Sequence, residues 1–156
     1  VDWYRRIFEA FRSQCPDGAW GIDVMTGFPG ETDEEFQNTY RFLRSLDFTY
    51  LHVFPYSARE GTVAAELPDP VDPPVRKVRT QRLLALSKSH RKAHYERAVG
   101  KHHPVVVENR RVNDQLRGLT GNYVPVLFDG PSQLMETLTS VCVRRVDEQV
   151  VYGETL

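Results

Sequence analysis

Apolar side chains recur along the first half of the chain with two alternating periods. Residues 3–12 and 36–46 place apolar side chains three or four positions apart, which predicts two helices with one buried face each. Residues 20–25 and 49–54 are short apolar, β-prone runs, which predict buried strands. Helix, strand, helix and strand in this order are typical of a parallel α/β fold. Two such units are too few to close a barrel, so we expect an open half-barrel whose exposed edge favours self-association.

The pattern changes in the second half. Prolines interrupt residues 57–74, and a long helix is predicted from about Val75 to Val99. Its predicted apolar side consists of Val78, Leu83, Leu86 and Ala93. Short β-prone runs follow at residues 105–107, 116–119, 123–128, 138–146 and 150–152, with a turn signal at residues 129–130. Short strands in this arrangement are typical of a small closed barrel of the OB type, which often binds nucleic acid.

The segment between the first predicted strand and the next helix carries the most specific local pattern. Thr32 and Glu35 have the spacing of a capping box at the start of a helix. Gly27 and Gly30 allow the backbone to approach closely whatever lies at the carboxyl end of the strand, where ligands bind in α/β folds. Taken alone, these glycines are also explained by a simple turn, and Glu31 by its favourable place at a helix N-terminus.

Three motifs together resemble one enzyme family. Residues 27–36 read GFPGETDEEF, residues 50–59 read YLHVFPYSAR before Gly61-Thr62, and residues 118–126 read GLTGNYVPV. In this order they are similar to signatures of the radical S-adenosylmethionine (SAM) methylthiotransferases, the third lying in the family's C-terminal TRAM domain. The HVFPYS and NY segments resemble the branch that adds a methylthio group to C2 of threonylcarbamoyl-adenosine next to the tRNA anticodon.

The resemblance implies an α/β partial radical-SAM (TIM-like) barrel followed by a small all-β TRAM (OB-like) barrel. Residues 1–74 would form the C-terminal part of the radical-SAM barrel, residues 75–99 a long basic helix completing or flanking it, and residues 100–156 the TRAM domain. The intact enzyme would use SAM and two [4Fe–4S] clusters. Cys15 and Cys142 are the only cysteines, whereas a cluster needs three or four thiolates. We therefore expect a C-terminal fragment that is inactive alone, holds no metal and binds no cofactor tightly.

Residues near the predicted strand ends are the candidates for contact with SAM. The resemblance implies this role for Gly27, Phe28, Pro29, Gly30, Phe54 and Tyr56. Phe54 and Tyr56 share one face of a strand with His52 and would border the adenine of SAM or the target base. Ordinary barrel packing is the alternative for this aromatic stripe, and His52 has no partners at metal-ligand spacing. Asp23 lies within an apolar strand and must be hydrogen-bonded or face the barrel lumen.

The net charge of −1 hides an uneven distribution of charged residues. Between Val75 and Lys101 cations dominate and Glu96 is the single acidic residue. A solvated helix face and a footprint for a polyanion are both open, and the position ahead of a predicted RNA-binding domain favours the second. The predicted RNA contacts are Arg59, Arg79, Arg82, Arg117, Asn122 and Tyr123, with Tyr123 stacking on an unpaired base and Asn122 reading its edge. Arg59 stands in a loop where the family often has Arg-Pro-Gly-Thr and this chain has Arg-Glu-Gly-Thr.

These observations predict a partner and a compartment. The expected partners are a tRNA anticodon stem-loop and the N-terminal part of the same enzyme. The cysteine usage and the lack of any apolar run of membrane-spanning length predict a cytoplasmic protein without membrane contact. Two alternatives stay open: a ribosomal-protein methylthiotransferase of the same superfamily, and a stand-alone, non-catalytic RNA-binding module.

Overall fold

The computed structural model describes residues 1–155, which form two compact units. The first unit consists of residues 1–16 and 20–90, and the second of residues 17–19 with the chain from Arg91 onward. The division falls inside the long helix rather than at one of its ends. None of the helices among the described residues is long and apolar enough to cross a membrane.

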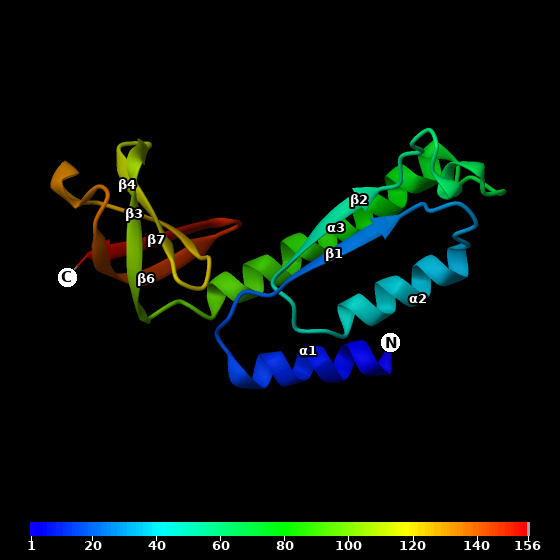
Figure 1. Ribbon diagram of the computed structural model, residues 1–156. Helices are drawn as coiled ribbons and strands as arrows, with labels where there is room; N and C mark the ends of the chain where they lie inside the picture. Colours follow the sequence, from blue (N-terminus) through cyan, green and yellow to red (C-terminus); the bar gives the residue numbers. More distant parts are fainter. Residues whose placement is uncertain (156) are drawn as a thin grey trace. The chain divides into compact units, whose positions relative to one another are not determined.

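The first unit alternates helices with two strands (Figure 1). Its elements are α1 (Asp2–Gln14), β1 (Gly21–Thr26), α2 (Asp33–Arg44), β2 (Tyr50–Pro55), the 3-10 helix η1 (Val63–Glu66) and α3 (Pro73–Glu96), whose last residues belong to the second unit. The predicted helix–strand–helix–strand order is therefore present, although α2 ends at Arg44, before the predicted end of the helix at residue 46.

Helix α2 begins with the predicted capping box. The Thr32 side chain accepts a hydrogen bond from the backbone N–H of Glu35, and the Glu35 carboxylate accepts one from the backbone N–H of Thr32 at 2.8 Å. This hydrogen bond from the Thr32 backbone, with a second from its hydroxyl, lowers the pKa of Glu35. Two donors that the first turn of a helix would leave unpaired are thereby satisfied.

Strands β1 and β2 pair in parallel and bury one face only. Ile22 pairs with Leu51, and both pack in a core with Phe36 and Leu43 from α2 and with Leu83 from α3. The opposite face carries exposed residues on both strands: Asp23, Met25, His52 and Phe54. Asp23 is therefore on an uncovered sheet face, where its charge remains accessible to solvent.

Helix α3 corrects one expectation about which residues are buried. It begins with Pro73 and Pro74, which a first helical turn accommodates because its N–H groups have no partner within the helix. Leu83 and Leu86 are buried as predicted, but Val78 and Ala93 are exposed. The buried face instead includes two polar residues that are matched by partners, Arg79 and Ser87, and the Ser87 hydroxyl accepts the N–H of Leu51 at 2.8 Å.

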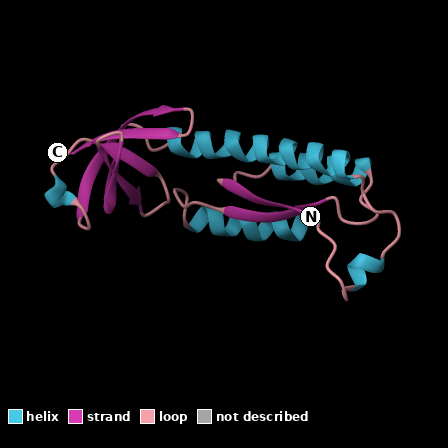
Figure 2. Cartoon of the chain, turned by 90° about the horizontal axis from the view of Figure 1, so that it is seen from above, coloured by secondary structure: helices cyan, strands magenta, loops and turns pink. Residues whose placement is uncertain are grey.

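The second unit is built almost wholly from strands (Figure 2). Strands β3 (His102–Val112), β4 (Gln115–Thr120), β5 (Pro125–Phe128), β6 (Leu138–Asp147) and β7 (Val150–Thr155) close into a barrel in the order β3-β4-β5-β7-β6. The turn signal at residues 129–130 does not make a hairpin, because β5 pairs in parallel with β7. The chain reaches β6 through a longer connection that contains the 3-10 helix η2 (Ser132–Leu134).

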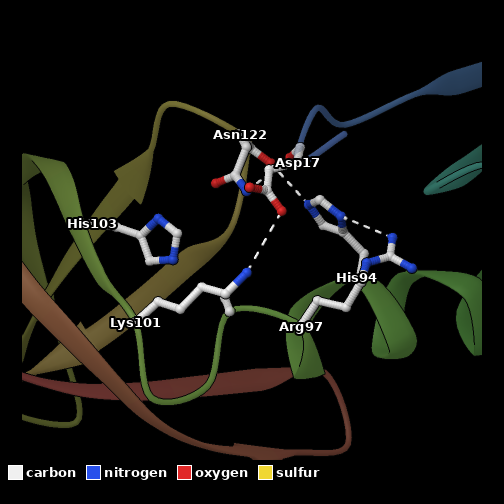
Figure 3. Close-up of a pocket in the computed structure, with 7 residues that line it drawn as sticks. Asp17, His94, Arg97, Lys101, His103 and Asn122 are labelled. Carbon is white, nitrogen blue, oxygen red and sulfur yellow. Dashed lines mark hydrogen bonds and ion pairs between the residues drawn. The ribbon is translucent and has the colours of Figure 1, made fainter. Parts of the chain in front are cut away.

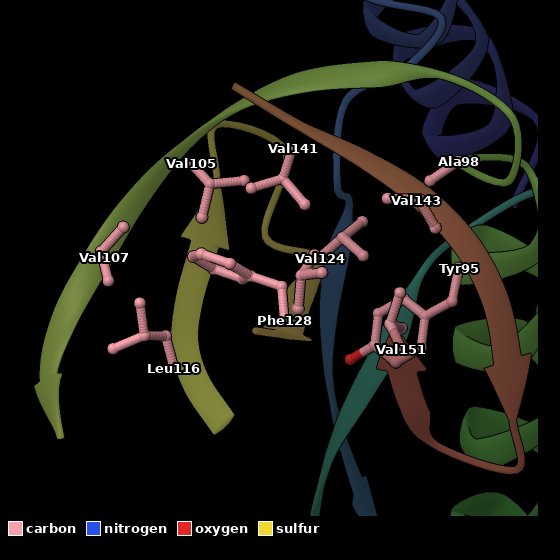
Figure 4. Close-up of a cluster of buried hydrophobic side chains, with 11 residues drawn as sticks. Tyr95, Ala98, Val105, Val107, Leu116, Val124, Phe128, Val141, Val143 and Val151 are labelled. Carbon is pink, nitrogen blue, oxygen red and sulfur yellow. The ribbon is translucent and has the colours of Figure 1, made fainter. Parts of the chain in front are cut away.

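Apolar side chains fill the barrel (Figure 4). The fully buried members include Val105, Val107, Leu116, Val124, Val126, Phe128, Val141, Val143 and Val151, and Tyr95 and Ala98 from the segment before β3 join them. Glycine is required at position 118, because a Cβ there would lie 2.3 Å from Cγ1 of Val105. The closed five-stranded barrel agrees with the strand pattern, while the names radical-SAM and TRAM for the two units stay predictions.

Candidate ligand and RNA-binding sites

The carboxyl ends of β1 and β2 lie at the same edge of the sheet because the strands are parallel and in register. The loops that leave this edge start at Gly27 and Tyr56. In parallel α/β folds this edge is where ligands bind, since loops and helix N-termini converge there. Within the first unit it is therefore the natural place to look for a small-molecule site.

The two glycines of the first loop allow a backbone conformation that other residues rarely adopt. Gly27 has φ +75° and Gly30 has φ +84°, a region that residues with a Cβ rarely adopt. A Cβ at Gly27 would lie 2.6 Å from Cγ of Arg76, so the close neighbour of this glycine is a side chain of α3. The N–H of Gly30 donates to the carbonyl of Asp69 at 2.8 Å. These contacts fix the loop, and their geometry alone gives it no ligand.

Glu31 does more than place a favourable charge at a helix N-terminus, because its carboxylate connects separate segments of the first unit. Its Oε2 accepts the N–H of Gly27 at 2.7 Å and Nη1 of Arg79 at 2.7 Å. Arg79 also donates to the Glu31 carbonyl at 2.9 Å and to Oδ1 of Asp33 at 2.6 Å. One carboxylate and one guanidinium therefore join the glycine loop, the start of α2 and the middle of α3.

This arrangement argues against Arg79 as a phosphate contact. The residue is only 5% exposed, and its guanidinium is engaged by two carboxylates and a carbonyl. Burial lowers the pKa of Arg79, but the hydrogen bonds with Asp33 and Glu31 raise it by more, so the side chain stays charged. Arg82 is also engaged, because it lies over the rings of Phe36 and Tyr40. The predicted role of these two arginines in RNA contact would require an exposure that Arg79 does not have.

An apolar pocket of about 380 Å³ opens beside the strand ends. It is lined by Met25, Phe28, Phe54, Pro55, Tyr56, Ser57, Arg59, Thr62 and Ala64. The rings of Phe28 and Tyr56 meet edge to face with their centroids 5.3 Å apart. The Tyr56 hydroxyl is buried and has no hydrogen-bond partner among residues 1–155. Aromatic walls and one guanidinium suit a flat, heteroatom-bearing ring.

The residues predicted to contact SAM do not all lie together in the structure. Phe28, Phe54 and Tyr56 line this pocket together, and Arg59, predicted to contact RNA, lies with them. Gly27, Pro29 and Gly30 do not line it. The aromatic residues and the glycine loop are therefore two separate features of the same strand edge.

In the second unit, the loop between β4 and β5 presents Tyr123. Its side chain is 66% exposed, and its φ of +62° lies in the left-handed region that costs energy for a residue with a Cβ. The Thr120 hydroxyl accepts the N–H of Val124 at 2.9 Å and donates to Oδ1 of Asn122 at 2.6 Å. Nδ2 of Asn122 donates to the carbonyl of Asp17 at 3.0 Å. The Asn122 amide is thus used within the protein, which argues against the predicted reading of a base edge.

A network of polar side chains surrounds Asn122 in the loop between β4 and β5 (Figure 3). The buried His94 donates from Nε2 to the carbonyl of Asn122 at 3.0 Å, which assigns the proton to Nε2 because a carbonyl can only accept. Nδ1 of the same ring then accepts from Nη2 of Arg97 at 3.4 Å. Nζ of Lys101 lies 3.6 Å from Oδ1 of Asp17. Nothing in the sequence indicated these roles of His94 and Asp17, whose contacts hold Asn122, the residue before Tyr123.

Arg117 lies on the barrel wall beside a shared carboxylate. Glu108 accepts from both Arg117 and Arg110. Burial raises the pKa of Glu108, and the hydrogen bonds from Arg117 and Arg110 outweigh this effect and lower it. Of the predicted RNA contacts in the second unit, Tyr123 is 66% exposed, while Arg117 is 27% exposed and paired with Glu108; Arg59 lies in the first unit.

The cysteines are not arranged for a cluster. Cys15 is exposed in the first unit, and Cys142 is buried in the second. Among residues 1–155 no group of three or more His, Cys, Asp or Glu side chains is placed to hold a metal ion.

Known proteins similar to this chain are tRNA-modifying enzymes. The chain is 34% identical over 156 residues, or 99% of its length, to tRNA-2-methylthio-N(6)-dimethylallyladenosine synthase of Protochlamydia amoebophila. It is 41% identical over 145 residues, or 90% of its length, to the threonylcarbamoyladenosine tRNA methylthiotransferase MtaB of Bacillus subtilis. It is 37% identical over 142 residues to the dimethylallyladenosine-type synthase of Syntrophotalea carbinolica.

These matches cover the chain but only a part of each relative. The chain spans 35% of the Protochlamydia protein and 32% of each of the other two. No protein-family model matches the chain. The homologues are thus tRNA methylthiotransferases, of two kinds that differ in the adenosine derivative they are named for.

Proposed function

We propose that this chain, whose homologues are tRNA methylthiotransferases, is the C-terminal part of such an enzyme. The observation that carries the proposal is sequence identity of 34–41% over 90% or more of the chain to enzymes of this kind. The first unit would be the end of a radical-SAM barrel, in which helices cover one face of a parallel sheet and the other face lines the lumen. The second would be a TRAM barrel that docks RNA.

The substrate we propose is threonylcarbamoyl-adenosine next to the anticodon. The HVFPYS segment and the identity of 41% to the threonylcarbamoyladenosine enzyme support this branch. Relatives named for dimethylallyladenosine, at 34% and 37% identity, make that base the specific competitor. Both substrates place the methylthio group on an adenosine of tRNA, so the RNA-docking part of the proposal is common to them.

The pocket beside the strand ends fits one part of SAM. Phe28, Phe54 and the Tyr56 ring would contact the adenine ring. The two separated cysteines do not fit an iron–sulfur cluster, so the clusters of the intact enzyme would be held by residues outside this chain. SAM, once bound in the intact enzyme, supplies the radical and the methyl group. The residues of this chain position its adenine and exclude water from it.

Docking of RNA would depend on Tyr123. An exposed aromatic ring on a small barrel can stack on an unpaired base, and each such contact is worth about 1–3 kcal/mol. The network of His94, Asn122 and Asp17 would keep the ring ready for stacking, so that less conformational entropy is lost on binding. Cations between Val75 and Lys101, other than the buried Arg79, would add phosphate attraction that weakens with salt.

Fluorescence anisotropy with labelled RNA tests this docking. We expect the chain to bind a tRNA anticodon stem-loop more tightly than a blunt duplex of equal length, and both more weakly at higher salt. Tyr123→Ala should remove the preference for the loop by about tenfold, while Tyr123→Phe, which keeps the ring, should retain it. Equal binding of loop and duplex by the wild type and both variants would show that Tyr123 does not dock RNA.

A further inference from the structure

A row of outward-facing side chains crosses four strands of the barrel. Arg117 on β4 pairs in register with Leu127 on β5, Leu127 with Tyr152 on β7, and Tyr152 with Arg145 on β6. Paired residues on neighbouring strands project from the same face of a sheet, so the four side chains lie next to one another. The residues that flank them on β4 and β5 are buried in or packed toward the core, which leaves this row on the outer surface. We call it the outer row.

One end of the outer row is a guanidinium stacked on an aromatic ring. Cζ of Arg145 lies 3.7 Å from the centroid of the Tyr152 ring, a close cation–π contact. The Arg145 side chain is 60% exposed, and the carboxylate near it, Oδ2 of Asp147, is 3.8 Å away and itself exposed. Arginine planes and aromatic rings are the two kinds of surface on which proteins stack unpaired bases.

The middle of the outer row borders a cavity of about 230 Å³. Its lining is apolar apart from Arg117 and Gln149, and consists of Val112, Arg117, Pro125, Leu127, Gln149, Val150 and Val151. This volume lies below the range of about 300–1,000 Å³ that is typical of sites for larger ligands. Apolar walls with two polar side chains suit a single flat base with a polar edge.

The stacking surface and its position favour RNA as the occupant over a protein segment. The positive charge of the row is local: the 60% exposed Arg145 guanidinium lies over an aromatic ring at one end, and Arg117 lies at the other. The Tyr123 loop leads directly into β5 (Pro125–Phe128), on which Leu127 of the outer row lies. A strand of RNA whose base stacks on Tyr123 can therefore continue from this loop onto the outer row.

We propose that the outer row, formed by Arg117, Leu127, Tyr152 and Arg145, binds unpaired nucleotides of RNA that extend beyond the Tyr123 loop. A base occupies the Arg145–Tyr152 stack or the cavity beside Leu127, and Arg117 faces the phosphates. This inference rests on the proposed function, because it requires that the barrel binds RNA. It adds a second subsite to that function and assigns roles to Tyr152 and Arg145, which neither motif nor charge run indicated.

Hexaadenylate labelled with fluorescein, titrated against the whole chain, tests the outer row. Arg145→Ala and Tyr152→Leu are each expected to weaken binding of the single strand about tenfold, with little change for a duplex of the same length. Arg144→Ala is the matched control: Arg144 is 55% exposed, carries the same charge one position away, and pairs with Glu154 rather than with an aromatic ring. It should weaken both RNAs equally and by less than Arg145→Ala weakens the single strand.

The outcomes separate the two claims. If Arg145→Ala behaves like Arg144→Ala, or if polyglutamate displaces the single strand as well as RNA does, the outer row is only a cationic surface and the inference is wrong. The proposed docking role of Tyr123 still holds in that case, provided that Tyr123→Ala abolishes the preference for the stem-loop. If the wild type binds no RNA, both the docking role of Tyr123 and the RNA-binding role of the outer row are wrong. Circular dichroism of Tyr152→Leu checks that its barrel is folded, and Arg145→Ala tests the same stack at an exposed position.

Discussion

Replacing Arg79 by methionine tests whether the ion pairs of Arg79 organise the first unit. Methionine keeps a long apolar side chain in the same helix face but removes every hydrogen bond that the guanidinium donates to Glu31 and Asp33. The Glu31 carboxylate would then stay largely buried with the Gly27 N–H as its remaining donor. We therefore expect the glycine loop and the start of α2 to lose stability together.

The expected cost follows from the exposure of each partner. Removing one partner of a fully buried ion pair costs about 3–5 kcal/mol. Asp33 is 89% exposed and is readily rehydrated, so the loss of its hydrogen bond contributes little. Glu31 is 15% exposed and keeps the Gly27 N–H as a donor. The net loss of stability is therefore roughly that of one hydrogen bond between charged groups, about 2–3 kcal/mol. With a urea dependence of about 1–3 kcal/mol per M, the unfolding midpoint should fall by about 1 M.

Tryptophan fluorescence measures this effect in the first unit alone. The chain has two tryptophans, Trp3 and Trp20, and both lie in that unit. Lys77→Met, which removes an exposed cation from the same helix, should change the midpoint by less than the equivalent of about 0.5 kcal/mol. If Arg79→Met and Lys77→Met unfold at the same urea concentration, Arg79 does not stabilise the glycine loop as described.

Three further predictions concern single positions. Thr32→Ala should destabilise the first unit by about 1 kcal/mol in the same tryptophan assay, because it removes the cap of α2. Gly118→Ala should destabilise the barrel by about 1–3 kcal/mol in thermal unfolding followed by circular dichroism, since its Cβ would overlap Val105. Burial and a nearby lysine lower the pKa of His103 from 6.5, so its contribution to stability is present above about pH 6.5 and lost as pH falls through the folded-state pKa. The barrel should thus be less stable at pH 5 than at pH 7.5, and His103→Gln should reduce this difference while His102→Gln should not.

Local sequence patterns predicted those parts of the fold that depend on local interactions. The capping box of Thr32 and Glu35 needs residues three positions apart, and it is present. The five strands of the barrel follow from runs of β-prone residues, and their ranges agree with the structure to within a few positions. The turn signal at residues 129–130 marks the end of β5, but it does not reveal that β5 pairs with β7, which comes later in the chain.

The candidate sites depended on contacts between distant parts of the chain, which a single sequence does not display. Arg79 reads as one cation in a basic run until α3 folds against Glu31, 48 residues earlier. Asn122 reads as an exposed amide until Asp17, 105 residues earlier, accepts its hydrogen bond. Phe54 and Tyr56 could be named because alternate residues of a strand share a face, but their joining with Phe28 and Arg59 required the loop geometry.

Mass spectrometry of tRNA nucleosides shows whether this chain is part of a tRNA methylthiotransferase. The gene that encodes this chain is deleted, and the strain is complemented with the wild-type gene or with Tyr123→Ala. We expect 2-methylthio-threonylcarbamoyl-adenosine to disappear on deletion, to return with the wild type and to return only in part with Tyr123→Ala. Loss of the methylthio group from dimethylallyl-adenosine instead would assign the other substrate branch. Unchanged levels of both methylthio nucleosides after deletion would contradict the claim that this chain is part of a tRNA methylthiotransferase.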